Sequence, residues 1–240
     1  TEKETNSIYK GLSSLKYMNS EVSEQLYSMK DQQFNSFVDL LAVFPGNSRQ
    51  REILVRLNYF SEFGQTLKLL KLCDLHDLYG NKKIIKKDKC NLPLDLVQKY
   101  AVSETAKQYR FEIDGINRLM REFANLIPES EIPLRTRLEA ESEFMGYLSY
   151  VNPKLQNTGF ILGVDTKYSP KISLYRLDTG VTETYKIAKA AYQKNPFDKG
   201  QILKFYSEER NKSRKVDGEW IKLPEKELWI TSYIIKQTDL

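Results

Sequence analysis

Residues 47–78 read NSRQREILVRLNYFSEFGQTLKLLKLCDLHDL, and this stretch predicts a helix, an aromatic turn and a second helix. Asn47 or Ser48 can cap the first helix, because a short polar side chain satisfies free N–H groups at a helix start. Asn58 is expected to end it, since Asn adopts the left-handed C-cap conformation more readily than most residues. Gly64 then releases the chain into the second helix. Connections are normally polar and exposed, so a turn this apolar is expected to pack against another segment.

A second unit of this kind lies upstream, at residues 11–29, GLSSLKYMNSEVSEQLYSM. A turn at Tyr17-Met18-Asn19 precedes a helix that should begin at Ser20, and Asn19 is the turn residue expected at positive φ. Two such units are typical of a paired helix-hairpin-helix element, which holds a nucleic-acid backbone through turn N–H groups and helix N-termini. The alternative is a capped helix pair that only supports the fold. The candidate DNA-binding residues of the two units are Lys16, Asn19, Ser20, Ser48, Arg49 and Arg51.

Three further helices are expected at residues 33–44, 103–126 and 134–150, where apolar residues recur every three or four positions. The basic segment GNKKIIKKDK, residues 80–89, precedes the second of these helices. Runs of charge are usually solvated, so we interpret this segment as a linker, with phosphate contact as the alternative.

After Asn152-Pro153 the apolar period changes from helical to two, which indicates strands. The strand candidates are residues 159–166, 171–177, 181–189, 200–207 and 228–235. Five short strands, with an irregular piece between the third and the fourth, favour a five-stranded OB-type β-barrel, with an SH3-like barrel as the alternative. We therefore predict an α+β chain with a helical helix-hairpin-helix domain at residues 1–150 and an OB-fold barrel at residues 151–240.

Two parts of the predicted barrel carry candidate contacts with single-stranded DNA. Alternation along the second strand places Tyr175 outside the barrel, beside Lys171, and an exposed aromatic next to cations is what stacking on bases requires. Lys186 on the third strand extends this surface. The stretch 208–227, expected to be a flexible loop, adds Arg210, Lys212, Arg214, Lys215 and Trp220. The alternatives are that Tyr175 only covers the barrel edge and that carboxylates in the loop offset its cations.

Composition is that of a globular, soluble chain: of 240 residues, 40% are hydrophobic and 29% charged. Residues 151–240 hold 16 Lys and Arg against 11 Asp and Glu, which equals the whole net charge of +5 and indicates an anionic partner there. No apolar run is long enough to span a membrane and no signal peptide opens the chain, so we expect a cytoplasmic location. Cys73 and Cys90 are expected to be free thiols. A start at Thr1, without Met, suggests a piece of a longer protein.

The sequence predicts no catalytic or metal site. The single histidine, His76, lies in a Leu-rich predicted helix, where a structural role is favoured over a catalytic one. Two cysteines and one histidine are too few for a zinc finger. Glu139, Glu141 and Glu143 are spaced by two, which scatters them around a helix instead of gathering them on one face. We therefore expect no cofactor in this chain.

The order of these pieces resembles the region that follows the catalytic domains in bacterial or phage C-family replicative DNA polymerases (DNA polymerase III alpha subunit). The resemblance lies in two phrases, ILVRLNYFSEFG at residues 53–64 and SEFMGYLSYVNP at residues 142–153, and it extends over most of the chain. It implies a helix-hairpin-helix region followed by an OB-fold. Family hairpins carry Gly-x-Gly where this chain has Tyr17-Met18-Asn19, and Tyr17 leaves less room for a phosphate.

The resemblance implies a non-catalytic, DNA-binding part of a DNA-directed DNA polymerase, a transferase associated with the nucleoid. This part would hold duplex primer-template and single-stranded template during DNA replication, while Mg²⁺ is expected only in the absent catalytic domain. Family members also bind a sliding clamp through a Gln-containing peptide, for which Gln65, Leu67 and Leu70 are candidates. The alternative function is a protein-interaction module that docks a sliding clamp or another replisome partner with no direct DNA contact.

Overall fold

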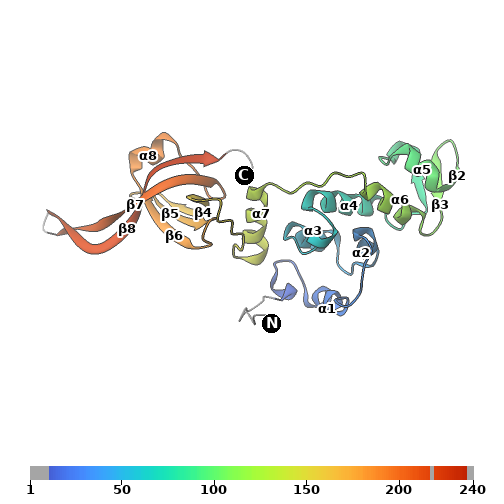
Figure 1. The fold of residues 1–240 in the computed structure, drawn as a ribbon, viewed down its shortest axis with the longest axis horizontal. Coiled ribbons are helices and arrows are strands. Elements are labelled where there is room, and N and C mark those ends of the chain that lie inside the picture. Colours follow the sequence, from blue (N-terminus) through green and yellow to red (C-terminus); the bar gives the residue numbers. More distant parts are fainter. Residues whose placement is uncertain (1–10, 217–218, 237–240) are drawn as a thin grey trace. The chain divides into compact units, whose positions relative to one another are not determined.

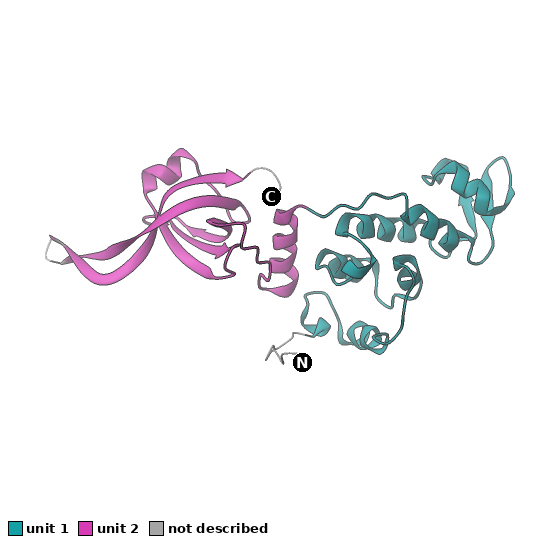
Figure 2. Ribbon diagram, viewed as in Figure 1, with its two compact units in different colours: residues 1–132 teal, residues 133–240 magenta. Residues whose placement is uncertain are grey.

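The structure, a computed structural model, describes residues 11–216 and 219–236. The chain divides into two compact units, residues 1–132 (unit 1) and residues 133–240 (unit 2), each of mixed helix and strand (Figure 2). The boundary lies at Pro133, and not at residue 151, because the helix that begins at Leu134 packs with the strands that follow it. Within the described ranges, no helix has the length and apolar character to cross a membrane.

Unit 1 combines helices with a small antiparallel sheet (Figure 1). Its helices are α1 (Ser20–Ser28), α2 (Phe37–Val43), α3 (Ser48–Arg56), α4 (Thr66–Tyr79), α5 (Leu94–Tyr100) and α6 (Gly115–Ala124). Short 3₁₀ segments lie at Leu12–Ser14, Ser61–Phe63 and Lys87–Lys89. Its strands are β1 (Ile84–Lys86), β2 (Ala101–Glu104) and β3 (Gln108–Phe111), which pair in the order β1-β3-β2.

The predicted helix–turn–helix at residues 47–78 is confirmed as α3, an aromatic turn and α4. Asn47 caps α3, in a capping box with Gln50. Asn58 has φ of 64°, and the N–H groups of Asn58 and Tyr59 donate to the carbonyls of Val55 and Leu54, which is the Schellman pattern. The sequence therefore places both ends of this helix correctly.

The aromatic turn packs against α2, as its apolar character predicts. The ring centroids of Phe60 and Phe63 lie 5.6 and 5.9 Å from the ring centroid of Phe37, which is buried in the core of unit 1. Gly64 follows with φ of 143°, a backbone conformation that residues other than glycine rarely adopt. The turn thereby joins α2, α3 and α4 in one apolar core.

The upstream unit differs from the expectation in two ways. Its first helix is only the 3₁₀ segment Leu12–Ser14, so residues 11–29 do not form a pair of α-helices. The turn residue at positive φ is Tyr17, at 69°, whereas Asn19 has φ of −97° and caps α1 by accepting from the N–H of Val22. Asn19 is more useful as a cap because its side-chain oxygen satisfies a free N–H at the helix start.

The helix predicted over residues 103–126 is wrong in its first half. Residues 101–111 form the hairpin β2–β3, and the helix α6 begins only at Gly115. Tyr109 and Phe111 alternate with exposed Arg110, so the apolar period is two at this point, and both rings enter the core. The basic segment 80–89 contains β1, which pairs with β3 through Ile84 and Arg110, so it is not simply a linker.

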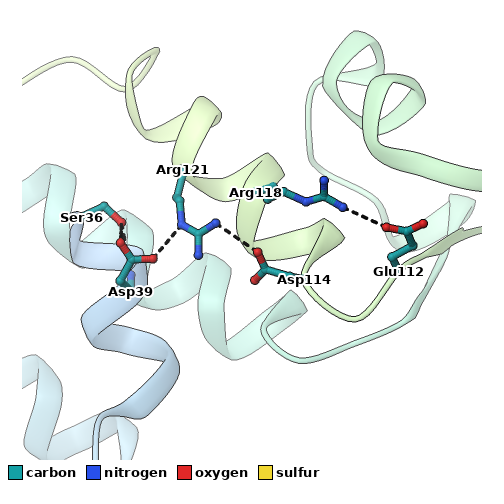
Figure 3. Close-up of polar contacts among 6 residues, drawn as sticks. All are labelled: Ser36, Asp39, Glu112, Asp114, Arg118 and Arg121. Carbon is teal, nitrogen blue, oxygen red and sulfur yellow. Dashed lines mark hydrogen bonds and ion pairs between the residues drawn. The ribbon is translucent and has the colours of Figure 1, made fainter. Parts of the chain in front are cut away.

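Two helices that are distant in sequence are tied by charge (Figure 3). Arg121 on α6 donates from Nε to Asp39 on α2 at 2.7 Å and from Nη1 to Asp114 at 3.2 Å. Asp39 is also held by the hydroxyl of Ser36, the N-cap of α2. Nearby, Arg118 pairs with Glu112. The pair between Arg121 and Asp39 fixes α2 against α6 at the margin of the core.

Unit 2 contains a closed ring of five strands, so the predicted strand number is confirmed. The strands are β4 (Thr158–Asp165), β5 (Lys171–Arg176), β6 (Thr182–Ile187), β7 (Ile202–Val216) and β8 (Glu219–Lys236). They pair in the order β4-β5-β6-β8-β7, which closes because β7 also pairs with β4. The β6–β8 pair is parallel, and the other pairs are antiparallel. Helix α8 (Lys189–Lys194) lies between β6 and β7 in the chain.

The ring has an apolar interior and one covered outer flank. Its interior holds Ile161, Ile172, Leu174, Tyr185, Leu203, Phe205 and Ile230. Helix α7 (Leu134–Ala140) continues as a π-helical turn to Met145 and packs Leu134 and Leu138 against the outer flank, beside Phe160 and Ile202. This flank therefore cannot meet a ligand while α7 is in place.

Candidate nucleic-acid interfaces

A row of polar and aromatic side chains crosses the outer face of the ring, from the start of β5 to the place on β8 where the β7–β8 hairpin leaves the ring. Lys171 on β5 lies opposite Lys186 on β6, and Lys186 lies opposite Trp229 on β8. Their neighbours in sequence point into the interior, so these three side chains point outward. Adjacent strands are about 4.8 Å apart, which places Lys171 and Trp229 about 10 Å from each other. These three residues are called the outer row.

Trp229 lies between two cations. The Nζ atom of Lys186 is 5.7 Å from the centroid of its ring, and the guanidinium carbon of Arg210 is 4.8 Å from it. The indole N–H donates to Glu227 at 2.8 Å, and Glu227 also forms an ion pair with Lys186. Burial opposes ionisation of Glu227, but the bonds from Lys186 and Trp229 outweigh it and lower the pKa of this carboxyl. The ring is thus half-buried, oriented and flanked by positive charge.

The turn between β4 and β5, which directly precedes Lys171 of the outer row, carries a second aromatic. The side chain of Tyr168 is 74% exposed, and the Nζ atom of Lys167 lies 5.6 Å from the centroid of its ring. Asp165, which precedes the turn, lies opposite Lys171 of the outer row. Tyr168 is therefore free of the core and available for stacking near the cations of the row.

The stretch 208–227 is a two-stranded hairpin, not the flexible loop that was expected. Its strands pair from Glu208 with Trp229 out to Val216 with Glu219. Near the ring its charges are compensated, since Arg210 pairs with Glu208, Lys212 with Glu225 and Lys226 with Glu209. The regular alternation of cations and carboxylates on facing strands favours this ladder over a disordered loop.

Farther out on the hairpin, Arg214, Lys215 and Lys222 are exposed, and none of them is in an ion pair among the described residues. The backbone of Trp220 lies opposite Lys215, but the predicted contact of its side chain falls outside the described part of the structure. Of the predicted cations, Arg210 and Lys212 are therefore engaged at the base, while Arg214 and Lys215 remain exposed.

Tyr175 is not the stacking residue that alternation suggested. It does point outward, but its side chain is only 5% exposed because α7 and the segment before β4 cover it. Its hydroxyl donates to the carbonyl of Tyr150 at 3.2 Å, and burial raises its pKa. A strand pattern shows which face a side chain is on, but it does not show that a distant helix covers that face.

In unit 1, the first turn and the start of α3 come together. The side-chain amide of Gln50 donates from Nε2 to the backbone carbonyl of Tyr17 at 3.2 Å. The guanidinium carbon of Arg49 lies 3.6 Å from the centroid of the Tyr17 ring, and Lys16 lies on the same ring at 4.8 Å. A hydrogen bond from Lys16, together with the charge of Arg49, lowers the pKa of the Tyr17 hydroxyl. The exposed Lys16, Asn19, Ser20, Ser48 and Arg49 thus remain candidates for phosphate contact.

Arg51 is a correction to the predicted set. Its side chain is 5% exposed and pairs with Asp77 on α4, so it holds α3 against α4 and does not reach a ligand. Arg51 points inward because it lies on the same helix face as Leu54 and Val55, which are in the core. Within the described structure, its Nε atom and the Nε2 atom of His76 are buried without a hydrogen-bond partner.

The candidate clamp peptide lies at the start of α4. Gln65 is the N-cap of α4, and Leu70 packs partly against the core. The backbone N–H of Gln65 donates to Glu129 at 2.7 Å, and the N–H of Leu67 donates to the carbonyl of Ser130 at 2.9 Å. An extended peptide would therefore form only if the first turn of α4 unfolded.

Within residues 11–216 and 219–236, no three His, Cys, Asp or Glu side chains are grouped to hold a metal ion. Glu141 is buried and accepts from the N–H groups of Ser149 and Tyr150, so it stabilises the chain after α7. His76 is on α4, and burial followed by the charge of Arg51 lowers its pKa. The two hydrogen bonds account for Glu141 in structural terms.

The comparison of this chain with family models, with curated proteins and with solved structures gives no match. Sequence reasoning missed Trp229 and Tyr168, two aromatics that lie close to cations at or beside the outer row. The sequence does contain a signal for Trp229. Trp229 lies between the apolar residues Leu228 and Ile230 on a predicted strand, so when their face is in the core, Trp229 is on the outer face.

Proposed function

We propose that unit 2 is an OB-type barrel that binds single-stranded nucleic acid across its outer row. Five strands in a closed ring, with a helix between the third and the fourth, support the OB assignment. In OB-folds the face of the second and third strands binds the ligand, together with the loops between strands one and two and between strands four and five. Here these parts are β5 with β6, the turn with Tyr168 and the β7–β8 hairpin.

The observation that carries the proposal is the position of Trp229 between Lys186 and Arg210. A base can stack on an oriented ring, while flanking cations neutralise the phosphates on either side. Lys171 and Lys167 continue the positive charge toward Tyr168. Glu208 and Glu227 now pair with two of these cations, so binding exchanges carboxylates for phosphates and requires low salt to be strong.

The biological setting we propose is DNA replication, as a non-catalytic part of a C-family replicative polymerase. It rests on the two sequence phrases at residues 53–64 and 142–153. In this setting the outer row would receive single-stranded template, and the chain would position DNA for chemistry performed elsewhere. The sliding-clamp contact would require the start of α4 to open.

The test is fluorescence anisotropy of a labelled oligothymidylate of about 16 nucleotides, the upper end of the site size of one OB-fold. We expect salt-sensitive binding by the whole chain. Trp229→Ala should weaken it by about 5- to 150-fold, the effect of about 1–3 kcal/mol for one stacked base. Tyr27→Ala, an exposed aromatic of unit 1, is the matched control and should bind normally. Unchanged affinity of the Trp229 variant would refute this site.

A protein-interaction module is the second candidate function, and the paired charges of the hairpin favour it. Tyr206, Ile221 and Ile234 are also exposed on β7 and β8, at 60%, 48% and 61%. Apolar contacts with a protein depend little on salt, whereas phosphate contacts weaken steeply as salt rises. Absence of oligonucleotide binding at low salt would favour this module.

A further inference from the structure

The sheet of unit 1 gathers positive charge from two segments that are far apart in sequence. Lys86 is the last residue of β1, and Lys107 lies in the turn between β2 and β3. The N–H of Lys87 donates to the carbonyl of Lys107 at 3.0 Å, which brings these segments into contact. The exposed cations at this edge, called the basic ridge, are Lys82, Lys83, Lys86, Lys89, Lys107 and Arg110.

The inner face of this edge is fixed by the core, which leaves the cations outside. Ile85 and Tyr109 lie opposite each other and are both buried. Their neighbours Lys86 and Arg110 therefore point outward on β1 and β3. A groove at this edge is lined by Lys86, Lys87, Asp88, Ala106, Lys107 and Gln108. The ridge is thus a fixed feature of the sheet and not a mobile charged tail.

The charge of the ridge is largely uncompensated. Two carboxylates lie within the segments that form it, Asp88 and Glu104, and Glu104 is already paired with Lys87. No ion pair within the described structure involves Lys86, Lys89 or Lys107. The average over residues 1–150 conceals this ridge, because acidic residues elsewhere in that part balance its charge. A dense row of unpaired cations favours a polyanion as the partner.

We propose that the basic ridge binds the phosphate backbone of double-stranded nucleic acid. The aromatic rings of this sheet, Tyr109 and Phe111, are both buried, so the ridge offers no stacking platform for an unpaired base. Its contacts are ammonium and guanidinium groups on a rigid edge, which suit phosphates held at fixed spacing along a duplex. This site is independent of the outer row of unit 2 and rests on separate residues.

The test uses the whole chain, a blunt duplex and the single-stranded oligothymidylate, at several salt concentrations. The variant Lys86→Glu with Lys107→Glu should bind the duplex more weakly and reduce the slope of log K against log salt by about 2, one unit for each phosphate contact. Lys30→Glu with Lys71→Glu is the matched control, because it makes the same charge change at exposed positions elsewhere in unit 1. Lys86→Gln with Lys107→Gln, which introduces no repulsion, should show the same slope change.

Measuring duplex and single strand separately distinguishes this inference from the proposed function. Both ridge variants should keep their affinity for the single strand, and the Trp229 variant should keep its affinity for the duplex. Equal losses in the ridge and control variants would show a general charge effect and would overturn the ridge. No duplex binding by the unaltered chain at low salt would overturn it as well, whatever the single-strand result. Circular dichroism confirms that each variant is folded.

Discussion

The hydroxyl of Tyr175 on β5 donates a hydrogen bond to the backbone carbonyl of Tyr150, at 3.2 Å. This bond joins the five-stranded ring of unit 2 to the chain segment that leads from α7 into β4. The Tyr175 ring also packs beside Leu138 of α7 and Phe160 of β4. Tyr175 therefore belongs to the contact between α7 and the ring, and it is removed from the surface that we propose for nucleic acid.

The first prediction concerns this residue. Tyr175→Phe should lower the free energy of unfolding by about 1 kcal/mol, the net value of one hydrogen bond, and leave oligothymidylate binding unchanged. Tyr175→Ala should cost about 3–5 kcal/mol, because it leaves a cavity under α7. Urea denaturation and anisotropy measure the two properties. Weaker binding by the folded Phe variant would return Tyr175 to the binding surface.

The second prediction concerns Gly159, where β4 passes close to β5. A Cβ atom there would lie 2.0 Å from Cδ2 of Leu174, which is fully buried in the ring. Gly159→Ala should therefore destabilise unit 2 by about 1–3 kcal/mol through overpacking. Gly163→Ala, on the same strand, is the control, because a Cβ atom there meets nothing within 4 Å. Equal stabilities of the two variants in urea would contradict the close approach.

The third prediction concerns His76, the single histidine of the chain. Burial, and then the charge of Arg51, lowers its pKa below the ordinary value of 6.5, although Asp77 opposes this shift. The unfolded state therefore binds this proton more tightly. His76 should contribute stability that is fully present above about pH 6.5 and is lost as pH falls through the lower, folded pKa.

Denaturation at a series of pH values between about 7 and 5 measures this effect, in a window above the ordinary range of carboxyl pKa values. His76→Gln should remove most of the slope in this window. A variant that keeps the full slope would show that another group titrates there.

The fourth prediction concerns the two thiols, which are both free. Burial raises the pKa of the Cys73 thiol to about 12, so almost no reactive thiolate is present near pH 8. Cys90 is only half-buried. A thiol reagent should therefore modify one residue in the folded protein and both in urea, and peptide mapping should place the first label on Cys90. Rapid native labelling of Cys73 would contradict its burial.

Much of the local structure could be predicted from the sequence, because local rules decide it. Asn47 caps the start of α3 and Asn58 ends it, both through contacts with residues a few positions away. The period-two pattern located the five strands of unit 2. The hairpin β2–β3 was missed because its alternation spans few residues and adjoins a strongly periodic helix, so the helical pattern was extended too far.

The sequence by itself determined the helix caps, the change from helices to strands after residue 153 and the excess of positive charge beyond residue 150. Only the tertiary structure decided which outward side chains stay exposed. Tyr175 and Arg51 were predicted to meet a ligand, but α7 covers one and Asp77 on α4 engages the other. Trp229 becomes a neighbour of Lys186, and Lys86 a neighbour of Lys107, because segments distant in sequence pair with each other. Periodicity fixes the direction of a side chain, whereas its neighbours depend on long-range packing that no local pattern encodes.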